Sequence, residues 1–122
     1  MKFLTALIKP FKLEEVKDAL AELRIDGMTV TEVKGFGISP GQGEIRRGGK
    51  RVRNLVPKLK IEVAVPDYLA MAAREGIVKS ANAGTIGDDA IWVLPLDEIV
   101  RIRTDDRGAA AFYPINSTGE QS

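Results

Sequence analysis

The sequence of 122 residues contains no cysteine and no histidine. Without cysteine the chain has no disulfide framework, no thiolate zinc site and no cysteine nucleophile. Without histidine it lacks the imidazole that most often acts as a base or a metal ligand. These absences exclude most hydrolases and metalloenzymes, so we predict a protein that is not an enzyme and has neither catalytic residues nor a metal site.

Long hydrophobic runs are also missing. The first ten residues hold only a short apolar stretch interrupted by lysine, and no segment approaches the roughly 20 apolar residues of a membrane-spanning helix. Hydrophobic residues make up 44% of the chain and charged residues 29%, which is ordinary for one compact globular domain. We therefore expect a cytoplasmic protein.

Positive charge is concentrated in one part of the chain. Residues 38–60 hold seven basic residues and one acid, a net charge of +6, whereas the rest carries −5, so that the total is only +1. The basic cluster at Arg46, Arg47, Lys50 and Arg51 could bind a protein, a membrane surface or nucleic acid, or could simply be solvated. A protein partner is favoured, because the cluster lacks the aromatic residues that stack on bases.

Apolar spacing predicts a strand over residues 2–9 and an amphipathic helix that starts at Lys12. The apolar face of this helix follows spacings of three and four residues and comprises Leu13, Val16, Leu20 and Leu23. Gly27 stands where a C-terminal cap is expected. A second strand over residues 28–33 leads to the turn Gly35-Phe36-Gly37, and a third alternates over residues 59–65.

Between the second and third strands, about residues 37–55 show no usable periodicity. We call this stretch the basic segment. Compact domains rarely contain structureless loops of this length, and those that occur are usually functional or disordered. Because the segment also holds nearly all the excess positive charge, we predict that it is the partner-binding loop.

The second half of the chain repeats the pattern of the first. Asp67 can cap a helix that ends near residues 82–84, a fourth strand follows over residues 90–94, and residues 97–104 resemble a further extended piece. The helix would pack through a face made mainly of small residues, namely Leu69, Ala72, Ala73, Gly76 and Ile77.

The order of these elements predicts an α+β, ferredoxin-like βαββαβ sandwich over residues 1–108, followed by a flexible tail over residues 109–122. Two helices can cover only one face of a four-stranded sheet. The other face carries alternating apolar residues, so we expect a closed homo-oligomer.

Two local patterns could bind an anion. The glycine-bearing turns at residues 35–37 and 84–89 could present free backbone amides, or could be plain turns. Arg101 and Arg103 lie two residues apart on an expected strand, so both would project from one face and could clamp a phosphate or carboxylate, or could be merely solvated.

Five segments, in order and in register over nearly the whole chain, resemble the PII signal-transduction proteins. They are Ile8-Lys9-Pro10-Phe11-Lys12, residues 27–37, Pro57-Lys58, Ile86-Gly87-Asp88 and Arg101-Ile102-Arg103-Thr104. The resemblance implies a homotrimer that binds an adenine nucleotide in each cleft between neighbouring subunits. It would place around this nucleotide Gly27, Met28, Thr29, Gly35, Phe36, Gly37, Ile38, Ala64, Gly87, Asp88, Asp89, Arg101 and Arg103.

The resemblance further implies that the basic segment controls a partner such as an ammonium transporter or a nitrogen-assimilation enzyme. Arg47 stands where the family inserts an arginine into a channel, so the protein would be recruited to the inner face of the membrane. Arg51 and Gly49 replace the family's modified tyrosine and serine, so neither modification can occur there.

Departures from the family pattern bear on the ligand. Ile38 and Ser39 replace the Arg and Gln of the magnesium and 2-oxoglutarate site, although Lys58, the usual counter-ion of that metabolite, is retained. Both ligands are therefore doubtful here.

In the phosphate turn, a Thr and two Lys are replaced by Ala83, Thr85 and Ala90. Charge-assisted hydrogen bonds contribute about 1.5 to 3 kcal/mol each, so their loss favours ADP or AMP, with ATP still able to bind.

Three other functions stay open at this point. One is a divergent energy sensor that prefers ADP or AMP, does not respond to 2-oxoglutarate and regulates carbon, bicarbonate or metal transport. A second is a slow ATPase that uses the same cleft. A third is a nucleic-acid or membrane-surface module that uses the basic segment.

Overall fold

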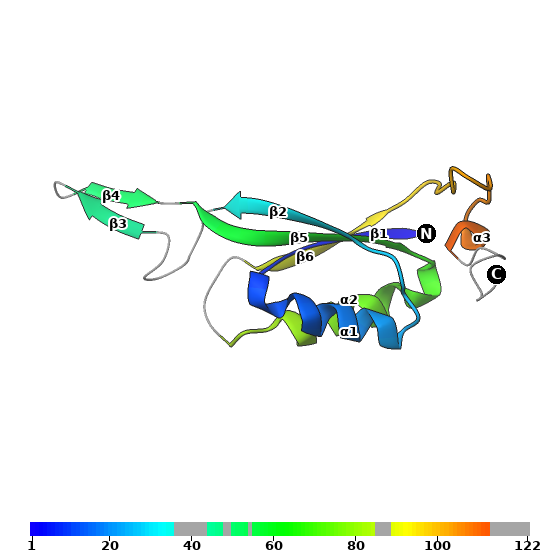
Figure 1. The fold of residues 1–122 in the computed structure, drawn as a ribbon, viewed down its shortest axis with the longest axis horizontal. Coiled ribbons are helices and arrows are strands. Elements are labelled where there is room, and N and C mark those ends of the chain that lie inside the picture. Colours follow the sequence, from blue (N-terminus) through cyan, green and yellow to red (C-terminus); the bar gives the residue numbers. More distant parts are fainter. Residues whose placement is uncertain (36–43, 48–49, 54, 85–88, 113–122) are drawn as a thin grey trace.

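The computed structural model describes residues 1–35, 44–47, 50–53, 55–84 and 89–112 (Figure 1). Its main sheet is antiparallel and has the strand order β2-β5-β1-β6. The four strands are β1 (Lys2–Ile8), β2 (Thr29–Gly35), β5 (Val56–Val65) and β6 (Ala90–Pro95). Helices α1 (Leu13–Glu22) and α2 (Asp67–Ala81) lie together on one face of this sheet, and a short 3-10 helix, η1 (Pro10–Lys12), joins β1 to α1. The predicted ferredoxin-like α+β fold is confirmed.

The core lies between the sheet and the two helices. Strand β5 alternates as predicted and buries Leu59, Ile61, Val63 and Val65. Helix α1 contributes Val16 and Leu20, and helix α2 contributes Ala73, Ile77 and Ala81. Ala72, predicted on the packed face of α2, is exposed, because the four-residue spacing of the buried positions turns Ala72 about 100° away from their stripe.

Helix α1 ends earlier than predicted, and Gly27 is not its cap. The helix ends at Glu22, and Arg24 adopts a left-handed backbone conformation with φ of 63°. The amide of Ile25 donates to the Leu20 carbonyl at 3.0 Å and that of Arg24 to the Ala21 carbonyl at 2.9 Å. These two bonds form a Schellman motif with arginine in the position that glycine usually takes.

The N-terminus of α2 also differs from the prediction. Pro66 is the cap residue, and Asp67 is the first residue of the helix and makes no cap hydrogen bond with its side chain. The Asp67 carboxylate instead pairs with the Met1 ammonium group at 2.8 Å. This hydrogen bond and the charge of the ammonium group lower the pKa of Asp67. The carboxylate therefore fastens the start of β1 to the start of α2.

The basic segment contains regular structure that its sequence did not predict. Strands β3 (Glu44–Arg47) and β4 (Lys50–Arg53) pair antiparallel, with Glu44 opposite Arg53 and Arg47 opposite Lys50. In Figure 1 this hairpin projects from one end of the main sheet. The Gly-Gly pair between the two strands is a recognised hairpin signal.

The chain after β6 does not form the extended piece predicted for residues 97–104. It turns back at residues 102–104, and Val100 makes an isolated bridge to Arg107. Arg101 and Arg103 therefore do not share one face of a strand, which corrects the prediction. The short helix α3 (Ala109–Phe112) follows, and its Ala111 is buried. The remainder of the tail lies outside the described residues.

Within the described part of the chain, no helix has both the length and the hydropathy needed to cross a membrane.

Candidate functional site

A cavity of 680 Å³ lies where the start of β2, the end of β5, the loop after β6 and helix α3 meet. We call it the β2–β5 cavity. Its lining includes the uncharged residues Gly27, Met28 and Ala64, and its charged residues are Arg24, Asp26, Glu62 and Arg101. A lining that combines apolar residues with hydrogen-bonding groups suits a flat heterocycle that carries a polar substituent.

Arg101 connects two walls of this cavity. Its Nε and Nη2 atoms donate to the Ala111 carbonyl oxygen at 3.0 Å and 2.7 Å. The guanidinium group thereby ties the loop after β6 to helix α3 and places a positive charge at the cavity. Arg103 lines a neighbouring surface depression together with Ile102 and Ala111.

The β2–β5 cavity brings together part of the predicted nucleotide site. Five predicted residues line it, namely Gly27, Met28, Thr29, Ala64 and Arg101. Gly35 lies at the far end of β2, opposite Val56. Five other predicted residues, Phe36, Gly37, Ile38, Gly87 and Asp88, lie outside the described residues. The basic residues Arg46, Arg47, Lys50 and Arg51 lie in the β3–β4 hairpin.

A second polar cluster lies at the other end of the sheet and consists of Lys9, Lys58 and Asp89. We call it the lysine–aspartate triad. Lys58 Nζ donates to Asp89 Oδ1 at 2.6 Å, and Lys9 Nζ donates to Asp89 Oδ2. The Lys58 side chain is 6% exposed and that of Lys9 14%.

Strand register explains how the triad forms. Lys58 lies on β5, Lys9 directly follows β1, and Asp89 directly precedes β6. These strands are neighbours, and Ile8 pairs with Leu59 while Leu7 pairs with Ala90. Sequence reasoning assigned no role to Lys9, because only the pairing of the strands brings Lys9 beside Lys58.

Electrostatics in the triad favour the ionised carboxylate. Partial burial alone would raise the pKa of Asp89, but hydrogen bonds from Lys58 and Lys9 and their positive charges outweigh it and lower that pKa. Asp89 therefore remains an anion at neutral pH, held by two ammonium groups.

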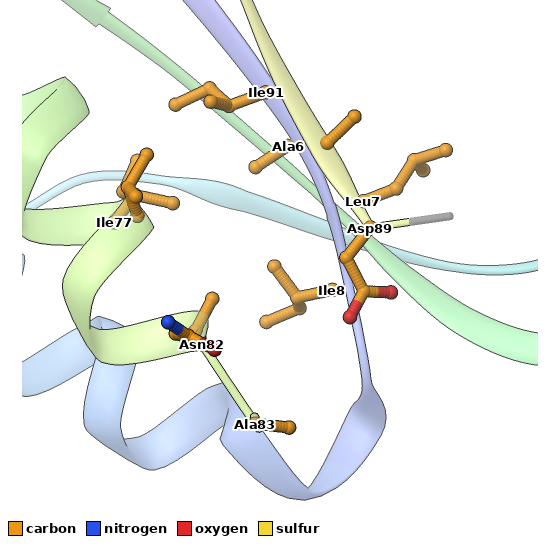
Figure 2. Close-up of a pocket in the computed structure, with 11 residues that line it drawn as sticks. Ala6, Leu7, Ile8, Ile77, Asn82, Ala83, Asp89 and Ile91 are labelled. Atoms are coloured by element: carbon orange, nitrogen blue, oxygen red, sulfur yellow. The ribbon is translucent and has the colours of Figure 1, made fainter. Parts of the chain in front are cut away.

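Asp89 also borders a small apolar cavity of 240 Å³ (Figure 2). Its walls come from β1, α2 and β6, with Ile8, Ile77 and Ile91 among the apolar residues. The polar Asn82 side chain is part of the same lining. Asp89 thus belongs both to the triad and to the lining of a largely apolar space between α2 and the sheet.

Sequence comparisons place this fold among known proteins. The family model described as "Nitrogen regulatory protein P-II" matches residues 1–106. The chain is 51% identical over 111 residues to nitrogen regulatory protein P-II of Azospirillum brasilense and 49% identical over 111 residues to that of Rhodospirillum rubrum. It is 47% identical over 111 residues to nitrogen regulatory protein P-II 1 of Escherichia coli K12. Each alignment covers 91% of this chain and 99% of the relative.

The chain belongs to the P-II family. Members of the P-II family are signal-transduction regulators rather than enzymes, and the family binds adenine nucleotides. Membership confirms the predicted resemblance. It favours the P-II regulator over the alternative of a divergent energy sensor for carbon, bicarbonate or metal transport.

Proposed function

We propose that this protein is a nitrogen-regulatory switch that acts as a homotrimer. Each cleft between neighbouring subunits would hold one adenine nucleotide, and the basic segment would report the bound nucleotide to a protein target. The observation that carries the proposal is the β2–β5 cavity, in which five of the predicted nucleotide-binding residues lie together.

The layout of the sheet supports a site shared between subunits. Thr29 pairs with Glu62 beside the cavity, whereas Val33 pairs with Lys58 in the triad, four residues further along. At about 3.3 Å per residue, this separation is about 13 Å along the strand. The cavity would take the adenine, and the turns at residues 35–38 and 87–89 of a neighbouring subunit would take the phosphates.

Side-chain chemistry supports ADP or AMP as the preferred nucleotide. Ala83 and Ala90 flank the turn at residues 84–89, where the family resemblance implies polar or cationic side chains. Lys58 is already paired with Asp89. The proposal therefore requires neither magnesium nor 2-oxoglutarate, and it includes no turnover of the nucleotide.

The β3–β4 hairpin supports a protein target. It projects beyond the sheet (Figure 1) and holds most of the basic residues of the chain's positive stretch. An acidic surface on an ammonium transporter or a nitrogen-assimilation enzyme would complement it. The protein would work in the cytoplasm and gather at the inner face of the membrane when its target is a transporter.

Calorimetric titration with AMP, ADP and ATP, each with and without magnesium and 2-oxoglutarate, tests the proposal, with sedimentation equilibrium to measure the oligomeric state. We expect a trimer that binds one nucleotide per subunit, ADP or AMP more tightly than ATP, and no effect of 2-oxoglutarate. Tight magnesium-ATP binding enhanced by 2-oxoglutarate would overturn the nucleotide preference. A monomer, or the absence of nucleotide binding, would overturn the proposed site.

A matched pair of variants locates the nucleotide. Ala64→Leu adds three carbon atoms to the lining of the β2–β5 cavity and should weaken nucleotide binding at least about tenfold, equal to about 1.4 kcal/mol. Ala72→Leu makes the same change on the exposed face of α2 and should leave affinity unchanged. Equal affinity in both variants would show that the nucleotide does not use this cavity.

A further inference from the structure

Arg24 combines an unfavourable backbone conformation with a place in the lining of the β2–β5 cavity. Its φ of 63° lies in the left-handed region, which glycine adopts freely and arginine does not. Its amide donates to the Ala21 carbonyl at 2.9 Å, and the next residue, Ile25, is buried, so the conformation is fixed from both sides. Residues held in such conformations cluster at binding and active sites. A binding role for the side chain would explain why this position holds arginine.

The charged side chains of the cavity are available to a ligand. In the part of the chain that the structure describes, no hydrogen bond or ion pair engages the side chains of Arg24, Asp26 and Glu62, although all three line the cavity. Arg24 is exposed and Glu62 is half-buried. The fourth charged residue, Arg101, already donates to the Ala111 carbonyl. Arg24 is therefore the arginine of this lining whose guanidinium group has no such partner.

The mixture of charges indicates which kind of ligand Arg24 can bind. The positive charges of Arg24 and Arg101 equal the negative charges of Asp26 and Glu62, so these four lining residues sum to zero. An anion gains little from Arg24 here, because the two carboxylates repel it. A neutral flat heterocycle gains more, since a guanidinium group stacks against the face of an aromatic ring. Carboxylates can also accept hydrogen bonds from amino groups at the edge of such a ring.

We propose that the Arg24 guanidinium lies against the face of a heterocycle bound in the β2–β5 cavity, and that this contact is the reason for arginine at a left-handed position. The inference rests on the proposed function, because the heterocycle would be the adenine of the nucleotide. It adds a residue that the family resemblance did not place at the nucleotide. Arg24 thereby raises ligand affinity while it lowers the stability of the free protein.

Two measurements on Arg24→Gly test both halves of this inference. In urea, the ligand-free variant should unfold at a higher concentration than the unmodified protein, because the backbone is relieved. In calorimetric titration it should bind AMP and ADP at least about fivefold more weakly, and by the same factor for both, because the two nucleotides share the base. A larger loss for ADP than for AMP would place Arg24 at the phosphates and overturn the proposal. Lower stability of Arg24→Gly would overturn the claim that arginine is unfavourable there.

Two further variants separate the side chain from the backbone. Arg24→Lys keeps the charge and the left-handed position but loses the planar group, so its affinity should fall between those of Arg24→Gly and the unmodified protein. Full affinity in Arg24→Lys would overturn stacking. Asp105→Gly is the matched control, because Asp105 also has a φ of 63° and does not line the cavity. It should gain stability and leave nucleotide affinity unchanged.

The same titrations distinguish failure of this inference from failure of the proposed function. Absence of nucleotide binding by the unmodified protein would overturn the proposed function and the contact with it. Nucleotide binding that Arg24→Gly leaves unchanged would overturn the contact alone.

Discussion

Arg101 offers the sharpest test of how the β2–β5 cavity is built. Its two hydrogen bonds, at 3.0 Å and 2.7 Å, converge on the carbonyl of the buried residue Ala111. In Arg101→Lys a single ammonium group can replace at most one of these bonds while the charge is kept. A charge-assisted hydrogen bond contributes about 1.5 to 3 kcal/mol. Because Arg101 is exposed to solvent, the loss of one such bond should cost only about 1 kcal/mol. The opening equilibrium of α3 should therefore rise about fivefold.

Amide hydrogen exchange measures this opening directly. The amides of Ala111 and Phe112 donate to the Gly108 carbonyl at 3.0 Å and 3.3 Å and report whether α3 is closed. Exchange should be slowest in the unmodified protein, faster in Arg101→Lys and fastest in Arg101→Ala, which loses both bonds. Arg107→Lys serves as the control, because among the described residues the ion pairs of the Arg107 side chain, both at 3.4 Å, are exposed. Identical exchange in all four proteins would refute the claim that Arg101 holds α3 against the cavity.

Further predictions concern stability, pH and the target. Arg24→Gly should raise the free energy of unfolding by about 1 kcal/mol in urea, because glycine adopts the left-handed conformation without strain; a loss of stability would show that the arginine side chain contributes more than its backbone costs. Leu20→Ala, at a fully buried position, should lower the free energy of unfolding by about 2 to 5 kcal/mol. A loss under about 1 kcal/mol would mean that the surrounding residues collapse around the smaller side chain. Because the pKa of Asp89 is lowered, its ion pairs stabilise the fold fully above the ordinary value of 3.8, and that contribution disappears as pH falls through the lower folded pKa. Urea unfolding of the unmodified protein should therefore lose more stability than Asp89→Asn between about pH 6 and about pH 3, whereas parallel losses would exclude this linkage. Arg47→Glu combined with Arg51→Glu should abolish target binding in a pull-down and leave nucleotide affinity unchanged, and retained binding would place the target contact elsewhere.

The framework of the fold could be predicted because it follows from periodicity. Alternation along residues 59–65 predicted a strand buried on one face, and spacings of three and four residues predicted both helices. Errors occurred at the ends of elements. The end of α1 depends on two backbone hydrogen bonds around Arg24, and nothing in the identity of that residue signals a left-handed turn.

The β3–β4 hairpin was missed for a related reason. Its short strands have no alternation of apolar and polar residues, so only the glycine pair at residues 48–49 signals it. The turn at residues 102–104 escaped prediction because Val100, Ile102 and their neighbours favour extended structure locally. There the chain folds back on itself, with Gly108 donating to the Ile99 carbonyl at 3.1 Å, a contact between residues that local pattern reasoning treats separately.

The sequence by itself determined the fold class, the concentration of positive charge near residues 38–60 and the resemblance that the family match confirmed. Each of these depends on composition or on spacing along the chain. Tertiary structure alone decided that Gly27, Ala64 and Arg101 would border one cavity and that Lys9 and Lys58 would meet at Asp89. Those groupings arise from strand order and register, which bring together residues that lie up to 80 positions apart in the chain.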